Sequence, residues 1–340
     1  MNKQQIIIVT QQNDPHADDV IMKLRELDHE PIRLNTDDVP IHTLLTFGIS
    51  NQTKSWNGAI TIQTNGRVIE PDHIQSIWWR RPGAFALPKE LSARERIFAQ
   101  SEIEQVLMGL WASVDCYWMS HPDHIRHASW KEHQLQRAAQ IGFDIPRTLI
   151  TNDAAEARDF YEICQEQMIY KVLSDPYLGA RELALQGVDE SVEAIATSTT
   201  LISEEELTYL DTIRLAPCQF QEYIPKKTEL RVTVIGDTVF AVEIDSQAHE
   251  ESRIDWRALP PEDLSWRQVH LPSALVDKCL AFVHNYHLNY SAMDFIVTPD
   301  DRYVFLENNP NGQFIWVEML VPELPMIDTL AHCLIRGANR

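Results

Sequence analysis

The segment Asp294–Asn311, DFIVTPDDRYVFLENNPN, constrains the fold of this chain more than any other. Two apolar stretches, Ala292–Val297 and Tyr303–Leu306, flank the turn residues Pro299-Asp300-Asp301. Short apolar runs on both sides of such a turn predict a β-hairpin. The apolar residues of both runs predict that the hairpin belongs to a buried sheet rather than to the surface.

The hairpin turn determines which side chains share a face of this sheet. A turn centred within Pro299-Asp300 places Asp294 opposite Phe305. Because residues two apart on a strand share a face, Asp294, Glu307 and Asn309 are predicted to point the same way. Acids at the end of buried strands are costly unless they are paired or bind a metal. Oxygen ligands in this arrangement predict a Mg²⁺ site, and a solvated polar face is the alternative.

Lys171 is the second unusual feature, because it lies inside the apolar stretch Ile169–Leu173. A buried ammonium group needs an anion such as a phosphate or a carboxylate. The residues alone leave two interpretations open. Lys171 either contacts a ligand phosphate, or it lies at a strand end where it reaches solvent or a structural acid.

The segment Gln219–Arg231, QFQEYIPKKTELR, is the third feature. Pro225 separates two extended stretches, so the short linker between them offers backbone groups to a flat base. Glu222 and Glu229 are candidates to accept hydrogen bonds from an exocyclic amine or ribose hydroxyls, and Arg231 is a candidate to face phosphate. A loop with solvated charges is the alternative for each of these residues.

The first third of the chain predicts an open α/β unit. The order of strand, helix and strand over 5–10, 14–28 and 31–35 is typical of this class. Further strands are predicted over 47–50, 59–63, 67–70 and 74–81, followed by a helix over 92–114 that Ser92 caps. The pattern changes at 118–123, which predicts domains over 1–118, 119–216 and 217–340.

The rest of the chain predicts a mixture of helices and strands. Helices are expected over 122–140, closed by Gly142, from an Asn152 cap to about 165, and over 273–285 and 325–337. Strands are expected over 147–151, 168–173, 218–224, 230–235 and 238–244, with loops over 174–187 and 256–270.

Composition and the absence of motifs exclude several functions. Lys plus Arg total 29 and Asp plus Glu total 50, so the net charge of −21 argues against binding to nucleic acid or anionic membranes. The five cysteines are scattered and no stretch is long enough to span a membrane, which predicts a reduced cytoplasmic protein. No P-loop, GxGxxG, GxSxG or HExxH motif occurs. The histidines at 121, 124, 127 and 133 are either metal ligands or surface and capping residues.

Taken in order, these segments resemble the ATP-grasp ligases over about residues 120–320. The resemblance rests on several short matches: Trp130-Lys131-Glu132, Lys171, QEYI at Gln221–Ile224, ELR at Glu229–Arg231, DWR at Asp255–Arg257, DFIV at Asp294–Val297 and LENNPNGQ at Leu306–Gln313. The resemblance implies an α/β ATP-grasp fold with an N-terminal pre-grasp domain, a central α/β domain and a C-terminal grasp domain built on an antiparallel sheet.

Within that superfamily the chain is most similar to the microviridin-type peptide cyclases, which are relatives of the RimK-type glutamate ligases. SIWWRRPG at Ser76–Gly83, Ser246-Gln247 and NPNGQFIWVE at Asn309–Glu318 carry this closer match. Asn308 departs from the family, which usually has an apolar residue there, and Ser174–Gly187 has no glycine-rich loop. The resemblance implies that the chain activates Asp or Glu side chains of a ribosomal precursor peptide with ATP and closes ω-ester or ω-amide rings.

The resemblance also implies roles for individual residues. ATP is expected to contact Lys131, Lys171, Gln221, Glu222, Tyr223, Ile224 and Glu229, while one or two Mg²⁺ ions bind Asp294, Glu307 and Asn309. Arg231 and Arg257 are expected to be catalytic. The acids Glu204, Glu205 and Glu206 are candidates for binding a leader peptide, or form a solvated helix start capped by Ser203. A homodimer is expected from the family. An intermolecular carboxylate–amine ligase and a non-catalytic nucleotide-binding module are the alternatives.

Overall fold

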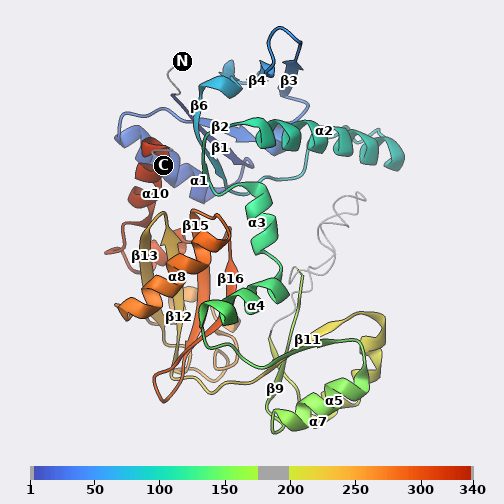
Figure 1. Cartoon of the computed structure of the whole chain (residues 1–340), viewed down its shortest axis with the longest axis vertical. Helices are drawn as coiled ribbons and strands as arrows, with labels where there is room; N and C mark the ends of the chain where they lie inside the picture. The colour runs from blue at the N-terminus through green and yellow to red at the C-terminus, as the bar shows by residue number, and fades with distance from the viewer. Residues whose placement is uncertain (1–3, 175–198, 338–340) are drawn as a thin grey trace.

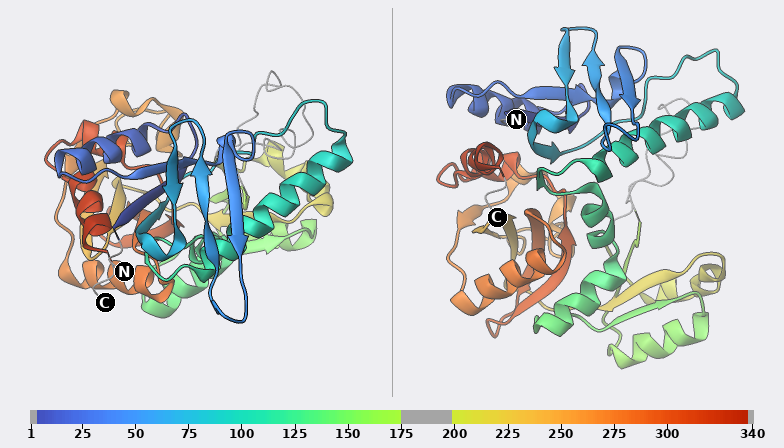
Figure 2. Two further views of the ribbon diagram at one scale, coloured as in Figure 1. Left: turned by 90° about the horizontal axis from the view of Figure 1, so that it is seen from above. Right: turned by 45° about the horizontal axis from the view of Figure 1, so that its top comes forward.

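The computed structural model describes residues 4–174 and 199–337, which form four β-sheets with helices packed around them. An N-terminal α/β part lies at the top of Figure 1, with a C-terminal antiparallel sheet below it. A smaller middle sheet lies beside the C-terminal sheet, and the long helix α2 projects from the N-terminal part (Figure 2). The predicted loop over 174–187 lies outside the described residues, apart from Ser174.

The N-terminal part contains a parallel sheet and a small antiparallel sheet. The parallel sheet has the order β2-β1-β6-β7 and consists of β1 (Gln5–Thr10), β2 (Ile32–Asn35), β6 (Ile74–Trp79) and β7 (Tyr117–Met119). The antiparallel sheet consists of β3 (Thr43–Gly48), β4 (Asn57–Ile62) and β5 (Arg67–Ile69). The helices are α1 (Pro15–Glu26) and α2 (Ala93–Ser113). Ser92 caps α2 as predicted, in a capping box with Glu95.

The middle part has an antiparallel sheet of order β10-β9-β11-β8. Its strands are β8 (Thr148–Thr151), β9 (Met168–Lys171), β10 (Thr200–Leu201) and β11 (Cys218–Glu222), and its helices are α5 (Ala154–Ile163) and α7 (Glu204–Leu207). The helix predicted over 122–140 is instead two helices, α3 (Pro122–Ala128) and α4 (Lys131–Ile141), because Trp130 has an extended backbone. Gly142 ends α4 in the left-handed region, as predicted. The cap of α5 is Asp153 rather than Asn152, because the Asp153 carboxylate accepts from the Ala155 N–H.

The C-terminal part is built on an antiparallel sheet of order β14-β13-β12-β15-β16. The strands are β12 (Thr228–Ile235), β13 (Thr238–Ile244), β14 (Trp266–Gln268), β15 (Tyr290–Val297) and β16 (Tyr303–Asn309), and the helices are α8 (Ser273–Asn285), α9 (Ile315–Leu320) and α10 (Met326–Arg336). The segment predicted as a loop over 256–270 contains β14, which forms the edge of this sheet. Short 3-10 helices occupy Thr36–Asp38, Pro71–His73, Leu210–Leu215, Trp256–Ala258 and Pro261–Asp263.

Two contacts cross the predicted division at 118 and 217. The C-terminal helix α10 packs beside α1 (Figure 1), so Leu330 and Leu334 share a buried cluster with Val20 and Leu24. Strand β11 pairs with β8 and β9, and therefore lies in the sheet of the middle part, although it follows residue 217. The domain division itself stays a prediction.

Three of the histidines noted in the sequence, His121, His127 and His133, serve in capping and packing. The His121 ring accepts a hydrogen bond from the Asp123 N–H at the start of α3. The ring of His133 stacks on His127 and lies 2.8 Å from the Tyr286 hydroxyl. Over residues 4–174 and 199–337, no group of three or more His, Cys, Asp or Glu side chains is arranged to hold a metal ion. No helix in these same ranges is long and apolar enough to cross a bilayer.

His16 makes the stability of the chain depend on pH. It is buried near Arg80, and its ring packs edge-on against Phe314 at 5.3 Å between centroids. Burial and then the charge of Arg80 lower the pKa of His16 to about 3 from its ordinary 6.5. Below an ordinary histidine pKa the unfolded chain therefore binds a proton that the folded chain does not, and the free energy of unfolding falls. We expect a loss of about 2 kcal/mol from this group by about pH 5.

Urea unfolding of wild type and a His16→Gln variant at neutral and acidic pH measures this contribution. The variant is expected to lose less stability on acidification than the wild type does. His42→Gln is the matched control, because His42 is exposed. Equal pH dependence of wild type and the His16→Gln variant would contradict the prediction.

Candidate active site

The hairpin of β15 and β16 brings the predicted metal ligands together. Asp294 pairs directly with Glu307 across the two strands, and Asn309 follows two residues later on the same face. The Asn309 side-chain amide lies 3.4 Å from the Asp294 carboxylate and 3.5 Å from the Glu307 carboxylate. The three side chains therefore converge at one end of the C-terminal sheet.

The predicted pairing of Asp294 with Phe305 is wrong, although the predicted common face is correct. The turn is longer than expected, so Phe305 pairs with Phe295. A bulge then shifts the register between Phe295 and Asp294, leaving Leu306 as an extra residue on β16. Because side chains alternate with a period of two, the extra residue returns Glu307 to the face of Asp294.

Two arginines contact these carboxylates from different elements. Arg231 lies on β12, the strand beside β15, and its Nη1 is 2.9 Å from Asp294 Oδ1. Arg257 follows Trp256 in a 3-10 helix, and its Nη2 is 3.2 Å from both Asp294 Oδ2 and Glu307 Oε1. The DWR segment thus contacts the acids of a hairpin that lies about 40 residues later in the chain.

The two predicted lysines approach the same acids from the middle part of the chain. Lys131 is the first residue of α4, with its Nζ 3.6 Å from Glu307 Oε2 and 2.7 Å from the Val172 carbonyl oxygen. Lys171 ends β9 and lowers the pKa of Glu307 through its charge. Lys171 is therefore near the acids and lines the cavity beside them, and its contact with a ligand phosphate stays a prediction.

Electrostatics at the site favour charged side chains. Burial raises the pKa of Glu307, but the charges of Lys171, Arg257 and Lys131 outweigh burial and hold the pKa well below its usual range. Burial lowers the pKa of Lys131. Burial also lowers the pKa of Arg257, yet the carboxylates of Asp294 and Glu307 raise it by more. The Glu307 carboxylate and the Arg257 guanidinium are thus charged at neutral pH.

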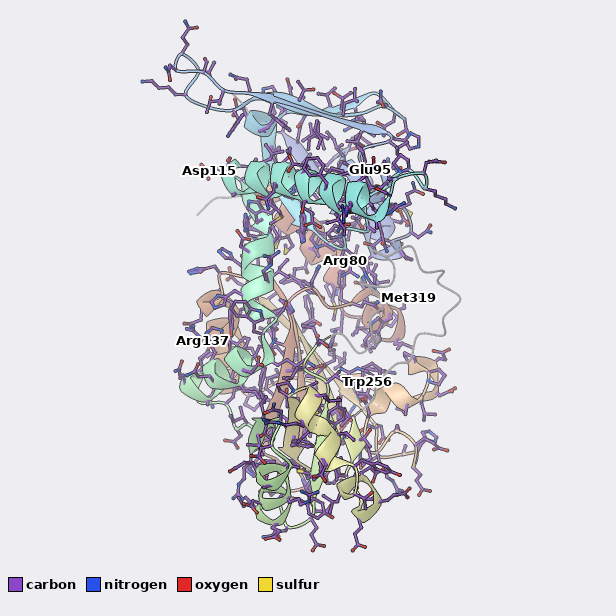
Figure 3. The ribbon with its side chains drawn as sticks, turned by 90° about the vertical axis from the view of Figure 1, so that its right-hand side faces the viewer. Arg80, Glu95, Asp115, Arg137, Trp256 and Met319 are labelled. Atoms are coloured by element: carbon purple, nitrogen blue, oxygen red, sulfur yellow. The ribbon has the colours of Figure 1, made fainter. Side chains whose placement is uncertain are left out.

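A cavity of about 1140 Å³ lies over these residues. Its charged lining consists of Lys131, Lys171, Arg231, Asp255, Arg257 and Glu307, and its uncharged polar lining includes Gln134, Asn308 and Asn309. Its apolar lining includes Trp130, Trp256, Leu259, Pro261 and Trp316. Figure 3 shows Trp256 below Arg80 and Met319, on the side of the molecule where the three parts meet.

A narrower pocket adjoins this cavity, since both are lined by Lys171, Asp255 and Arg257. The pocket contains all the predicted base-binding and ribose-binding residues, namely Gln221, Glu222, Tyr223, Ile224 and Glu229. Its apolar lining comes from Pro146, Ile169, Ile254, Ile296 and Leu306. It holds about 40 Å³, so a purine has to widen it on binding.

Several polar groups of this pocket already have partners, while Gln221 Oε1 is buried without a hydrogen bond. The Glu222 carboxylate accepts a hydrogen bond from the Arg147 N–H at 2.8 Å. The Gln221 amide donates to the Thr148 hydroxyl at 3.0 Å. Glu229 is buried and pairs with Lys226 at 2.8 Å, and burial raises the pKa of Glu229 more than the lysine lowers it. Glu229 therefore has a fixed orientation toward the pocket.

Sequence reasoning missed several residues that shape the site. Asp255 pairs with Arg257 at 3.4 Å, although only the arginine of the DWR segment was assigned a role. Asn308, the departure from the family pattern, is buried, and its side chain accepts from the Ser291 hydroxyl. Gln134 was given no role, yet its side chain contacts the backbone of Asn308. The sequence did hold a signal for Gln134, because residues three apart on a helix share a face and Gln134 follows Lys131 by three residues.

The three acids proposed for leader binding lie away from the cavity. They form α7, whose Leu207 packs in the cluster that contains Phe160 of α5. Glu206 closes a capping box with Ser203, as the structural alternative predicts. Glu204 and Glu205 are exposed.

Comparisons with known proteins agree with this geometry. The family model described as the MvdD pre-ATP grasp domain matches residues 5–126. A RiPP-associated ATP-grasp ligase from Chryseobacterium gregarium, solved with ADP and a leader and core peptide, is 31% identical, with a TM-score of 0.87. That match covers 98% of this chain and 96% of the ligase. Comparison with curated protein sequences found no match.

Two macrocyclases from Microcystis aeruginosa MRC are also similar. MdnC, solved with the precursor peptide MdnA, is 29% identical with a TM-score of 0.83, over 97% of this chain and 99% of MdnC. MdnB is 27% identical with a TM-score of 0.77, over 98% of this chain and 99% of MdnB. These matches confirm the predicted ATP-grasp fold. The chain therefore belongs to the RiPP-associated ATP-grasp ligases of the microviridin type.

Proposed function

We propose that this chain is an ADP-forming ligase that closes rings in a ribosomal precursor peptide. In this proposal ATP phosphorylates an Asp or Glu side chain of the peptide, and a Ser, Thr or Lys side chain of the same peptide displaces the phosphate. The products are an ω-ester or ω-amide crosslink, ADP and phosphate. The similar proteins MdnC and the Chryseobacterium ligase are described as bound to precursor or leader and core peptides, which supports a peptide substrate.

The balance of charge in the cavity carries the proposal. Four cationic side chains line the cavity, Lys131, Lys171, Arg231 and Arg257. Two carboxylates line it with them, Asp255 and Glu307, and a third, Asp294, contacts both arginines from the sheet. Four positive charges minus three negative charges leave an excess of one positive charge, in a chain whose net charge is −21. A local excess of positive charge in an acidic chain suits a polyanion such as a nucleoside triphosphate.

The donor set also suits Mg²⁺. Asp294 and Glu307 offer carboxylate oxygens side by side, and Asn309 adds an amide that reorients easily to present its oxygen. The cationic groups that contact these acids show that the pair attracts positive charge. We assign Asp294, Glu307 and Asn309 to hold one or two Mg²⁺ ions, which neutralise the phosphate charge when bound.

The chain's own residues then position the reacting groups. Lys131 and Lys171 bind the phosphates nearer the nucleoside, because both line the cavity and Lys171 also lines the narrow pocket. Arg257, which is exposed in the cavity, is placed to contact the transferring group. Arg231 is buried and fixed by Asp294 and the Gln313 carbonyl, so it stabilises charge from a constant position. Phosphoryl transfer depends on such positioning and charge neutralisation.

Leader binding by α7 remains part of the proposal for two of its acids. Glu204 and Glu205 are free to pair with a basic residue of a leader helix, while Glu206 is committed to the cap of α7. The narrow pocket beside Tyr223 and Ile224 is assigned to adenine.

Intact-mass spectrometry tests the proposed reaction. The protein is incubated with ATP, Mg²⁺ and the short peptides encoded beside its gene. Loss of the mass of one water per ring, with release of one ADP, is the expected result. A gain equal to the mass of an amino acid would contradict ring closure and support the intermolecular ligase. Release of no ADP with any of these peptides would contradict a ligase acting on them.

The role of Glu229 gives a second prediction, for nucleotide affinity. Replacing a buried carboxylate acceptor for ribose hydroxyls by a neutral amide oxygen weakens these hydrogen bonds by about 1.4 kcal/mol, which is about tenfold in Kd. Glu229→Gln should therefore raise the Kd of ADP about tenfold in isothermal titration calorimetry. Glu250→Gln, at an exposed glutamate that follows β13, is the matched control.

An analogue separates ribose recognition from a general loss of pocket shape. Wild type should prefer ADP to 2′,3′-dideoxy-ADP, and this preference should be smaller in Glu229→Gln, whose amide oxygen is a weaker acceptor. If the preference is as large in the variant as in wild type, Glu229 does not bind the ribose.

A further inference from the structure

The segment that carries two of the assigned metal ligands lies at an open edge of its sheet. Strand β16 is the last strand in the order β14-β13-β12-β15-β16, so it has a paired strand on one side only. Glu307 and Asn309 lie on either side of Asn308, and their positions depend on how the backbone at Asn308 is held. An edge backbone without partners is free to shift or twist.

A buried side chain from α4 takes the place of the missing strand. The Asn308 N–H donates to Gln134 Oε1 at 2.9 Å, and Gln134 Nε2 donates to the Asn308 carbonyl oxygen at 2.8 Å. Gln134 Nε2 also donates to the Ala128 carbonyl oxygen at 2.7 Å. Gln134 is 2% exposed, so water does not compete for these hydrogen bonds.

We propose that Gln134 is a positioning residue that sets the placement of Glu307 and Asn309 for metal binding. The inference rests on the proposed function of these two residues as Mg²⁺ ligands. The primary amide of Gln134 provides both a donor and an acceptor, which is what the N–H and C=O of Asn308 need together. Neither a carboxylate nor an apolar side chain can do this.

The helix that carries Gln134 makes the connection stiff. Lys131 lies three residues earlier on α4 and contacts Glu307 itself, with Nζ 3.6 Å from Oε2. Leu135 and Ala138 of the same helix are buried in the cluster that contains Phe305 of β16. One rigid helix therefore holds the charge of Glu307 and the backbone of Asn308 at the same time.

The other end of the segment is held independently by the N-terminal part. Arg80, which is 2% exposed, donates to the Asn311 carbonyl oxygen at 3.0 Å, and the Asn311 amide donates back to the Arg80 carbonyl oxygen. Gly312 follows, where an added Cβ would lie 2.8 Å from Arg231 Nη2. Loss of the Gln134 contacts is thus expected to displace the Glu307–Asn309 stretch while Asn311 stays in place.

The test measures metal binding directly, without turnover. Mn²⁺ binding to the ADP complex is followed by electron paramagnetic resonance for wild type, Gln134→Met and the matched control Gln140→Met, whose side chain is exposed on the same helix. We expect Gln134→Met to raise the Kd of Mn²⁺ about tenfold, the lower end of the range for residues that orient ligands. The Kd of ADP without metal should change by less than about twofold, since Gln134 does not line the narrow pocket assigned to adenine and its amide is bonded to backbone groups of the chain.

The outcomes separate this inference from the proposed function. If wild type binds Mn²⁺ with ADP and Gln134→Met binds it equally well, Gln134 does not position the ligands. If wild type itself binds no Mn²⁺ with ADP, the assigned ligand set fails and the inference fails with it. If Gln134→Met does not fold, Gln134→Glu is measured instead, because it keeps an acceptor for the Asn308 N–H but loses both donors. An unchanged Mn²⁺ Kd in that variant would also overturn the inference.

Discussion

Replacing Asp294 by Asn should reduce ADP formation about 10³-fold, the largest effect that we expect for a single residue. Asp294 is buried and is the carboxylate that Arg231 and Arg257 both contact. The substitution keeps the size of the side chain but removes the charge needed to hold Mg²⁺ and to balance the two guanidinium groups. The rate of ADP release at saturating ATP, Mg²⁺ and peptide measures the effect.

The variant also needs a test of folding, because removing one partner of a buried ion pair is destabilising. Asn keeps an oxygen that accepts from Arg231, so we expect a folded protein with a lower free energy of unfolding. Asp301→Asn is the matched control, since Asp301 lies in the turn of the same hairpin and pairs only at the surface with Lys227. A folded Asp294→Asn variant that keeps a tenth or more of the wild-type rate would contradict the assignment.

Replacing Arg257 by Met should reduce the rate of ring formation about 10²-fold. Arg257 contacts Asp255, Asp294 and Glu307 in the structure, and it is exposed in the cavity, so its charge is available to the transferring phosphoryl group. Its charge does not change with pH in the range where the protein is folded, because the carboxylates raise its pKa above the ordinary value. Arg257→Lys should recover part of the rate, since it restores the charge but not the planar donor geometry.

Two measurements show which step depends on Arg257. ADP release reports phosphoryl transfer, and trapping with hydroxylamine reports the acyl phosphate. If Arg257 stabilises phosphoryl transfer, both signals fall together in Arg257→Met. Arg267→Met is the matched control, because Arg267 is exposed on β14 and pairs with Glu243. A rate of ADP release within about threefold of wild type would contradict the proposed role.

Sequence reasoning was most accurate where neighbouring residues determine the structure. The apolar run Gln5–Thr10 is β1, with the predicted bounds. Ser92 caps the start of α2 and Gly142 caps the end of α4, as expected. Each of these features depends on residues that are close to one another in the sequence. The errors lie where two local signals compete. Asn152 and Asp153 are both good caps, and only the backbone at Asp153 directs its carboxylate to the Ala155 N–H.

The hairpin illustrates a correct conclusion that was reached with an incorrect register. Alternation along β15 and β16 predicted a common face for Asp294, Glu307 and Asn309, and the structure has it. The longer turn alone would have put Asp294 and Glu307 on opposite faces of the sheet. The bulge at Leu306 returns both side chains to the same face. Turn length and bulges depend on packing of the whole sheet, so spacing in the sequence does not reveal them.

By itself, the sequence determined many of the helices and strands, the acids of the hairpin and the resemblance to ATP-grasp ligases. Only the tertiary structure decided which cations meet those acids. Lys131 reaches Glu307 from α4, Arg231 reaches Asp294 across a neighbouring strand, and Gln134 completes the edge of β16. These contacts join residues far apart in the chain. Their formation depends on the order of the strands and on the burial of α4 against β16, which local propensity does not encode.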